Sequence, residues 1–215
     1  EHYNDWREII ASFGLGERFA NTDVREQAKG YLPTTEFYNR IYGQKGWKAI
    51  TIRSLSIGQG EILVTPLQLA NQAAAIANKG YYITPHFNRN DSMKSDIHTT
   101  LVDSTHFDVI HRGMARVMTD GTGRWYNIPE LQMCGKTGTV QNPHGEDHAL
   151  FIGFAPKDNP QIAVAVAVEN AGFGATWACP MATLVMEQYL TGEIKRNALY
   201  ERMVNANLID KSDEE

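Results

Sequence analysis

Long hydrophobic runs, paired cysteines and an excess of positive charge are all missing from this sequence of 215 residues. The longest apolar run, residues 162–168, falls far short of the roughly 18 residues that a membrane span needs. Two cysteines, Cys134 and Cys179, are too few for a disulfide framework or a thiolate metal site, and their apolar surroundings favour buried free thiols. A net charge of −5 argues against a nucleic-acid partner, because binding phosphates requires a basic face.

What remains is an ordinary globular composition, with 42% hydrophobic and 21% charged residues. The length suits a single domain, which we place over residues 1–200, followed by a polar, acidic tail over residues 201–215. The first five residues are polar and do not resemble a signal peptide. The protein is therefore either cytosolic, or its targeting segment lies outside these residues.

Helical periodicity recurs in four segments. These are residues 3–13, 66–79, 104–120 and 178–190. The second has the clearest start, because Thr65 can cap it and Gln68 completes a capping box, while Gly80 supplies a stop. In the last, the residues expected to face inward are Met181, Ala182, Val185, Met186 and Tyr189.

The pattern changes to strands after residue 130. Three strands are predicted over residues 131–141, 149–156 and 161–170, and a short turn should pair the last two as an antiparallel hairpin. Residues 83–100 are polar and aperiodic and are predicted to form a loop. Strands followed by a terminal helix that packs back on them predict an α+β arrangement of an antiparallel sheet with flanking helices.

The first of these strands carries a K-T-G-T motif: Lys136, Thr137, Gly138 and Thr139. An ammonium group and two hydroxyls on one strand can bind a carboxylate or an oxyanion, and the glycine lets a peptide approach the backbone. An extended ligand could also add beside such a strand as a further strand. Alone the motif is weak, since a K-[ST]-G triplet arises by chance in roughly one chain in ten of this length. The alternative is a solvated strand with an incidental lysine.

Context strengthens the motif, because K-T-G is also a signature of serine enzymes that include penicillin-binding proteins and class A β-lactamases. The sequence around it resembles the penicillin-binding protein 2 family of class B peptidoglycan D,D-transpeptidases. The matching stretches are residues 32–34, 56–60, 65–70, 76–80, 113–114, 121–123, 135–139, 154–156 and 168–170. They run in the family order and cover most of residues 10–190.

The resemblance implies the C-terminal part of a transpeptidase domain, in which a five-stranded antiparallel sheet and a helical subdomain flank the site. It makes Lys136 the lysine of the third motif, which helps set the electrostatics of the site. It makes Thr137 and Thr139 the groups that bind the donor's carboxylate, with Gly138 between them. The backbone N–H of Thr139 would be half of the oxyanion hole.

The sequence departs from the family in its serines. The family requires an S-x-x-K nucleophile motif and an S-x-N motif. None of the seven serines begins either motif; they are residues 12, 54, 56, 92, 95, 104 and 212. In the family both motifs precede the part that is matched here, so we expect the nucleophile to lie outside this chain and the isolated chain to be unable to acylate.

By resemblance, the implied activity is cross-linking of peptidoglycan stem peptides in cell-wall elongation, with β-lactams as substrate mimics. Also implied are an extracytoplasmic placement at the bacterial inner membrane, an anchor outside this chain and a membrane partner that polymerises glycan. No cofactor or metal is expected. Alternatives within the fold are a D,D-carboxypeptidase, a β-lactamase or a β-lactam sensor. An interaction module without chemistry, belonging to the wall-elongation complex, is an alternative of another class.

Two further segments have competing interpretations. His144 and His148 flank two carboxylates as a metal site would, but Pro143 and Gly145 place them in a turn, which favours a loop with one structural histidine. His148, which begins the next strand, is the better candidate for a role. Residues 172–177 contain exposed aromatics that either line the substrate groove or pack in a core or interface.

Overall fold

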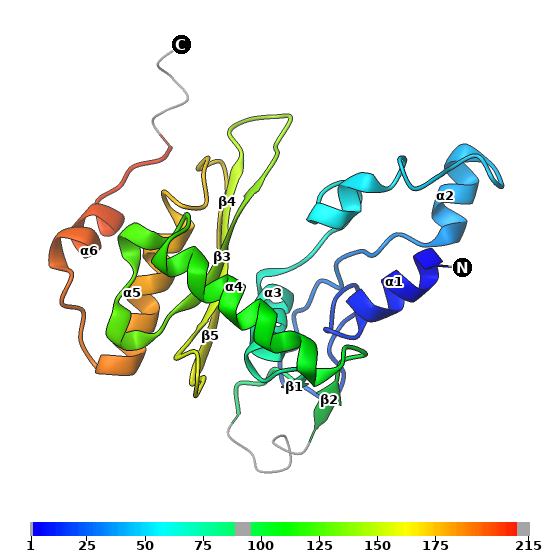
Figure 1. Cartoon of the computed structure of the whole chain (residues 1–215). Coiled ribbons are helices and arrows are strands. Elements are labelled where there is room, and N and C mark those ends of the chain that lie inside the picture. The colour runs from blue at the N-terminus through cyan, green and yellow to red at the C-terminus, as the bar shows by residue number, and fades with distance from the viewer. Residues whose placement is uncertain (1, 89–95, 210–215) are drawn as a thin grey trace. The chain divides into compact units, whose positions relative to one another are not determined.

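The computed structural model describes residues 2–88 and 96–209, and Figure 1 shows its elements. The chain divides into two compact units, Glu1–Phe107 and Asp108–Glu215, each with its own hydrophobic clusters. Within the described ranges, no helix combines the length and the apolar character needed to cross a membrane.

Most of the regular elements of the first unit are helices. Its elements are α1 (His2–Ala11), α2 (Thr35–Tyr42), the 3-10 helix η1 (Arg53–Ile57), α3 (Pro66–Ala77), strands β1 (Tyr81–Ile83) and β2 (Ile97–Thr99), and the 3-10 helix η3 (Ser104–His106). The capping box predicted for α3 is confirmed: the Thr65 hydroxyl accepts from the N–H of Gln68, whose side chain accepts from the N–H of Thr65. Gln68 is also buried, and its amide donates to two loop carbonyls. The cap therefore ties α3 to the preceding loops as well as starting it.

The loop predicted over residues 83–100 is wrong at its ends, where β1 and β2 form an antiparallel ladder with Tyr82 opposite His98. The rings of Tyr82 and His98 stack with their centroids 5.0 Å apart. The hydroxyl of Thr84 donates to Asp96 at 2.7 Å just beyond the strands. Three-residue strands stabilised by such cross-strand contacts leave no periodicity to detect in the sequence. Residues 89–95 of the predicted loop lie outside the described part of the chain.

The second unit contains the sheet. Its elements are α4 (Phe107–Thr119), which begins at the division, the 3-10 helices η4 (Arg124–Tyr126) and η5 (Pro129–Leu131), strands β3 (Cys134–Val140), β4 (His148–Ala155) and β5 (Ile162–Val168), and helices α5 (Ala178–Thr191) and α6 (Asn197–Val204). The three strands predicted here are confirmed and pair antiparallel in the order β3-β4-β5. The boundary predicted between the domain and the tail, at residue 200, falls within α6, which ends at Val204.

The two faces of this sheet differ in side-chain size. On β5, valines and Ile162 alternate with alanines, and the larger set pairs with the β4 positions that include Phe151 and Gly153. Phe151 and Val164 belong to the core cluster that also contains Ala182 and Met186 of α5. Helix α5 therefore covers the valine face of the sheet, as Figure 1 shows. On the opposite face, the ring of Phe154 lies 4.8 Å from that of the buried His111 of α4.

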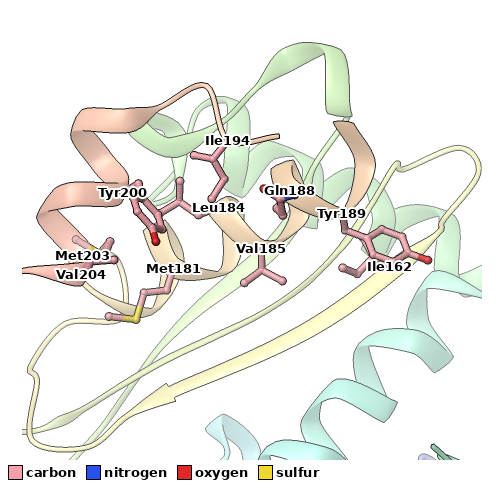
Figure 2. Close-up of a pocket in the computed structure, with 10 residues that line it drawn as sticks. All are labelled: Ile162, Met181, Leu184, Val185, Gln188, Tyr189, Ile194, Tyr200, Met203 and Val204. Atoms are coloured by element: carbon pink, nitrogen blue, oxygen red, sulfur yellow. The ribbon is translucent and has the colours of Figure 1, made fainter. Parts of the chain in front are cut away.

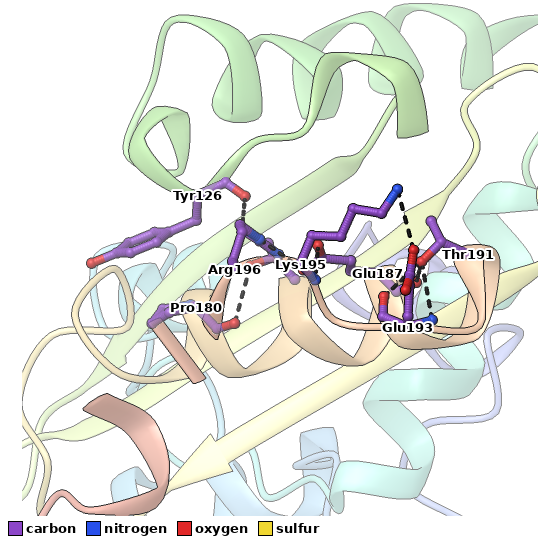
Figure 3. Close-up of polar contacts among 8 residues, drawn as sticks. Tyr126, Pro180, Glu187, Thr191, Glu193, Lys195 and Arg196 are labelled. Atoms are coloured by element: carbon purple, nitrogen blue, oxygen red, sulfur yellow. Dashed lines mark hydrogen bonds and ion pairs between the residues drawn. The ribbon is translucent and has the colours of Figure 1, made fainter. Parts of the chain in front are cut away.

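The inward face predicted for the last helix is partly wrong. Ala182 and Met186 are buried, but Val185 is 50% and Tyr189 is 62% exposed. The buried stripe instead includes a charged residue, Glu187. Its carboxylate accepts from the Arg196 guanidinium at 2.8 Å and from the backbone N–H of Lys195 at 3.0 Å (Figure 3). A buried carboxylate that is hydrogen-bonded in this way avoids the cost of an unpaired charge.

Arg196 extends this contact to the segment after α4. Its Nη1 donates to the backbone carbonyl of Tyr126 at 2.8 Å (Figure 3), and Arg202 of α6 donates to the Tyr126 hydroxyl at 3.3 Å. The guanidinium of Arg202 also lies over the ring of Trp177, 5.5 Å from its centroid. The residues that follow α5 therefore contact both Trp177, at the start of α5, and Tyr126, at the end of η4.

The two cysteines are buried free thiols, as the sequence predicts. Burial raises the pKa of Cys134 to about 12 and that of Cys179 to about 12, from 9.0. In the unfolded chain the thiols lose their protons near pH 9.0, whereas in the folded chain they keep them to about pH 12. The thiols therefore contribute stability that is fully present below pH 9 and is lost as the pH rises toward 12.

We expect a thiol reagent at pH 8 to modify neither cysteine of the native chain and both in concentrated guanidinium. Rapid native modification of either one would contradict the buried placement.

Candidate functional site

The K-T-G-T motif lies in the middle of β3, at one edge of the three-stranded sheet. Its only partner among the described strands is β4, so its other side presents backbone groups for pairing. Successive side chains of a strand point to opposite faces, which puts Thr137 and Thr139 on one face and Lys136 on the other. The register pairs Thr137 with Phe151 and Thr139 with Ala149, so both threonines lie on the valine face of the sheet, two residues apart.

The Lys136 side chain is exposed, opposite Ile152 of β4. Its ammonium group donates to the backbone carbonyl of Thr137 at 2.5 Å, so it curls along the strand. This places a positive charge beside the backbone of Thr137, within the motif. In a site from which water is displaced, such a charge attracts an anion more strongly than it does in bulk water.

Thr137 has a hydroxyl partner outside the motif. Its Oγ1 lies 2.7 Å from the Oγ1 of Thr122, in the turn between α4 and η4. The sequence contains this turn as one of the stretches that resemble the family, but gives Thr122 no role. The two residues are fifteen positions apart in the sequence, so no local pattern of residues predicts this contact.

Two glycines allow other parts of the chain to lie very close to the motif. A Cβ at Gly135 would lie 2.1 Å from Cζ of Phe151, so Phe151 packs directly on the strand. A Cβ at Gly174 would lie 2.2 Å from the carbonyl oxygen of Gly138 and 2.3 Å from that of Leu150. The loop after β5 therefore runs against β3 and β4 at the motif. Its Phe173 is 71% exposed, whereas Trp177 is half-buried and belongs to the core contacts of α5.

The histidine turn between β3 and β4 is held by hydrogen bonds. Nδ1 of His148 accepts from the N–H of Asn170 at 3.0 Å, and the Asn142 side chain donates to that of Asn170 at 2.7 Å. No group of three or more metal-ligating side chains comes together within residues 2–88 and 96–209. His148 thus ties the ends of β4 and β5 together, which fits the structural interpretation of this turn.

A concavity of about 560 Å³ lies beside α5 (Figure 2). It is lined by Ile162, Met181, Leu184, Val185, Gln188, Tyr189, Ile194, Tyr200, Met203 and Val204. Val185 and Tyr189, which the sequence places inward, open into it. Apart from Gln188 and the two tyrosine hydroxyls, the side chains that line it are apolar.

Comparison with known proteins gives this geometry its context. The family model of the penicillin-binding protein transpeptidase domain matches residues 2–187. The chain belongs to this family. A curated relative, the peptidoglycan D,D-transpeptidase MrdA of Acinetobacter baumannii, is 33% identical in an alignment of 215 positions that covers 88% of this chain and 31% of that protein.

Solved structures of the transpeptidase family have the same fold. Penicillin-binding protein 2 of Pseudomonas aeruginosa, in complex with WCK 5153, has 35% identity and a TM-score of 0.76, covering 90% of this chain and 44% of that one. Penicillin-binding protein A of Mycobacterium tuberculosis, as its imipenem acyl-enzyme complex, has 25% identity and a TM-score of 0.71, covering 87% and 42%. The α+β fold predicted from the sequence is confirmed. The chain spans about a third of the length of the curated relatives that it matches.

Proposed function

We propose that this chain is the substrate-binding portion of a peptidoglycan D,D-transpeptidase, acting within a longer polypeptide that we call the full-length protein. The observation that carries the proposal is the K-T-G-T motif on an open edge strand of a transpeptidase-family fold. The relative of A. baumannii is named for this activity, and that of M. tuberculosis forms an acyl-enzyme with imipenem.

In the proposed complex, the donor peptide lies along β3 and adds to the sheet edge. The hydroxyls of Thr137 and Thr139 donate to its terminal carboxylate, and the charge of Lys136 favours that anion. The N–H of Thr139 helps to stabilise the oxyanion that forms when the peptide carbonyl is attacked. Penicillins present a carboxylate and a reactive carbonyl in a similar relation, so they bind the same groups.

We propose that the nucleophile is supplied from outside these 215 residues, because none of their serines begins an S-x-x-K motif. In the reaction, a serine hydroxyl attacks the carbonyl carbon between the two terminal D-residues of the donor, and the last residue leaves as its free amine. An acceptor amine then attacks the serine ester, which forms the cross-link and regenerates the hydroxyl. The chain described here binds and orients the donor in both steps.

An exchange reaction with the full-length protein tests the proposed transpeptidase activity directly. We expect that a donor peptide ending in two D-amino acids, incubated with it and a labelled D-amino acid, exchanges its last residue for the label. Mass spectrometry of the peptide would detect the exchange. Hydrolysis without exchange would indicate a D,D-carboxypeptidase. Neither reaction, together with no acylation by penicillin, would contradict the proposal and favour the interaction module.

The setting of the full-length protein follows from the same proposal. Peptidoglycan is assembled outside the cytoplasmic membrane, so we place this portion on the extracytoplasmic face, with an anchor that is not among the described helices. A glycan-polymerising membrane protein would be its partner, because each cross-link requires newly polymerised strands. This placement rests on the family and on no contact in the chain.

A further inference from the structure

We infer that Thr122 is a positioning residue of the transpeptidase site, which fixes the hydroxyl of Thr137 as a hydrogen-bond donor to the carboxylate of the donor peptide. The inference rests on the proposed function and deepens it. It starts from the contact of 2.7 Å between the Oγ1 atoms of Thr122 and Thr137.

The turn that carries Thr122 is held in place by its backbone. The N–H of Gly121 donates to the carbonyl of Arg116 at 2.8 Å, and that of Gly123 donates to the carbonyl of Val117 at 2.9 Å. Neither glycine leaves room for a side chain, since a Cβ at Gly121 would lie 2.8 Å from Cα of Val117 and one at Gly123 would lie 2.6 Å from the Met118 sulfur. The turn thus presents Thr122 to β3 from a fixed position.

The two hydroxyls together have one hydrogen more than their contact uses. Two hydroxyls carry two hydrogens, and the contact between them uses one, so one hydrogen remains for a third group. An ionised carboxylate only accepts hydrogen bonds, so it takes this remaining hydrogen. When Thr122 donates to Thr137, the hydrogen of Thr137 points away from Thr122 and is available to the carboxylate, and each bond polarises the next.

Without the Thr122 hydroxyl, the Thr137 hydroxyl can rotate toward other acceptors. The loss would fall mainly on ligands that carry a carboxylate, because an ester carbonyl accepts a weaker hydrogen bond than an ionised oxygen does. The free energy of unfolding should change little, because both hydroxyls lie at the surface, where a single hydrogen bond adds little stability. Binding and stability should therefore respond differently to a change at Thr122.

The experiment measures the acylation rate constant of the full-length protein with a penicillin and with the methyl ester of its carboxylate. We expect Thr122→Val to slow acylation by the free acid about tenfold and to change that by the ester less than twofold. Thr122→Ser keeps the hydroxyl and should restore the rate with the acid. Thr122→Ala gives the same comparison if the valine variant fails to fold.

Thr119→Val is the matched control, since Thr119 lies three residues earlier and its hydroxyl donates to the neighbouring Asp120. It should leave both rates unchanged. Equal slowing of acid and ester by Thr122→Val, or no slowing of either, would overturn the inference while the proposed function stands. No acylation of the unmodified protein by either compound would overturn both.

Discussion

Lys136→Ala in the full-length protein is expected to slow acylation by labelled penicillin about 100- to 1,000-fold. The ammonium group is the positive charge of the K-T-G-T motif, and it lies along the strand at the carbonyl of Thr137. In the proposed site this charge favours the carboxylate of the ligand, and we expect its loss to cost about as much as the loss of one preorganised oxyanion-hole donor. The rate of covalent labelling, followed by in-gel fluorescence over time, measures the effect.

Lys157→Ala provides the control, because this lysine belongs to the same unit and pairs with Asp158 at the turn between β4 and β5. A pair of this kind contributes little to stability, and we expect the rate of labelling to stay within twofold of the unmodified protein. Lys136→Arg keeps the charge on a side chain of different shape, and its labelling rate should lie between those of Lys136→Ala and Lys157→Ala. A labelling rate of Lys136→Ala within threefold of the unmodified protein would show that Lys136 has no role in the site.

The second large effect concerns folding. Gly174→Ala should destabilise the chain by about 3 kcal/mol, because its Cβ would collide with the carbonyl oxygens of Gly138 and Leu150. Backbone atoms of two paired strands cannot move aside as a flexible side chain can. A loss of this size would lower the melting temperature by roughly 10 °C, which circular dichroism would record.

Gly113→Ala is the matched comparison within the same unit. This glycine lies in α4, is exposed, and has nothing within 4 Å of the Cβ position. Alanine there should raise stability by about 0.5–1 kcal/mol through helix propensity and a less flexible unfolded chain. Equal melting temperatures for the two variants would contradict the close approach of the loop after β5 to the motif.

The elements that the sequence predicts well are those set by neighbours along the chain. The capping box of α3 needs only Thr65 and Gln68. The strand that carries the K-T-G-T motif is predicted from its own residues, and β3 lies within the predicted range. The motif is also local, because four successive residues place two hydroxyls on one face. The family resemblance rests on such short stretches in order.

What the sequence could not predict depends on distant partners. Glu187 is buried on α5 because Arg196, nine positions later, meets its carboxylate, whereas polarity alone puts it on the outside. Val185 and Tyr189 then turn outward on the same helix. The contact between Thr122 and Thr137 arises in the same way, because a turn that follows α4 packs beside a strand that begins a dozen residues later.

The central claim is that these 215 residues supply one wall of an acyl-transfer site whose nucleophile lies elsewhere. Treatment of the 215-residue chain and the full-length protein with labelled penicillin, under identical conditions, tests it most directly. We expect covalent label on the full-length protein alone, with the adduct on a serine that begins an S-x-x-K motif outside these residues. Stable covalent labelling of the 215-residue chain would contradict the claim.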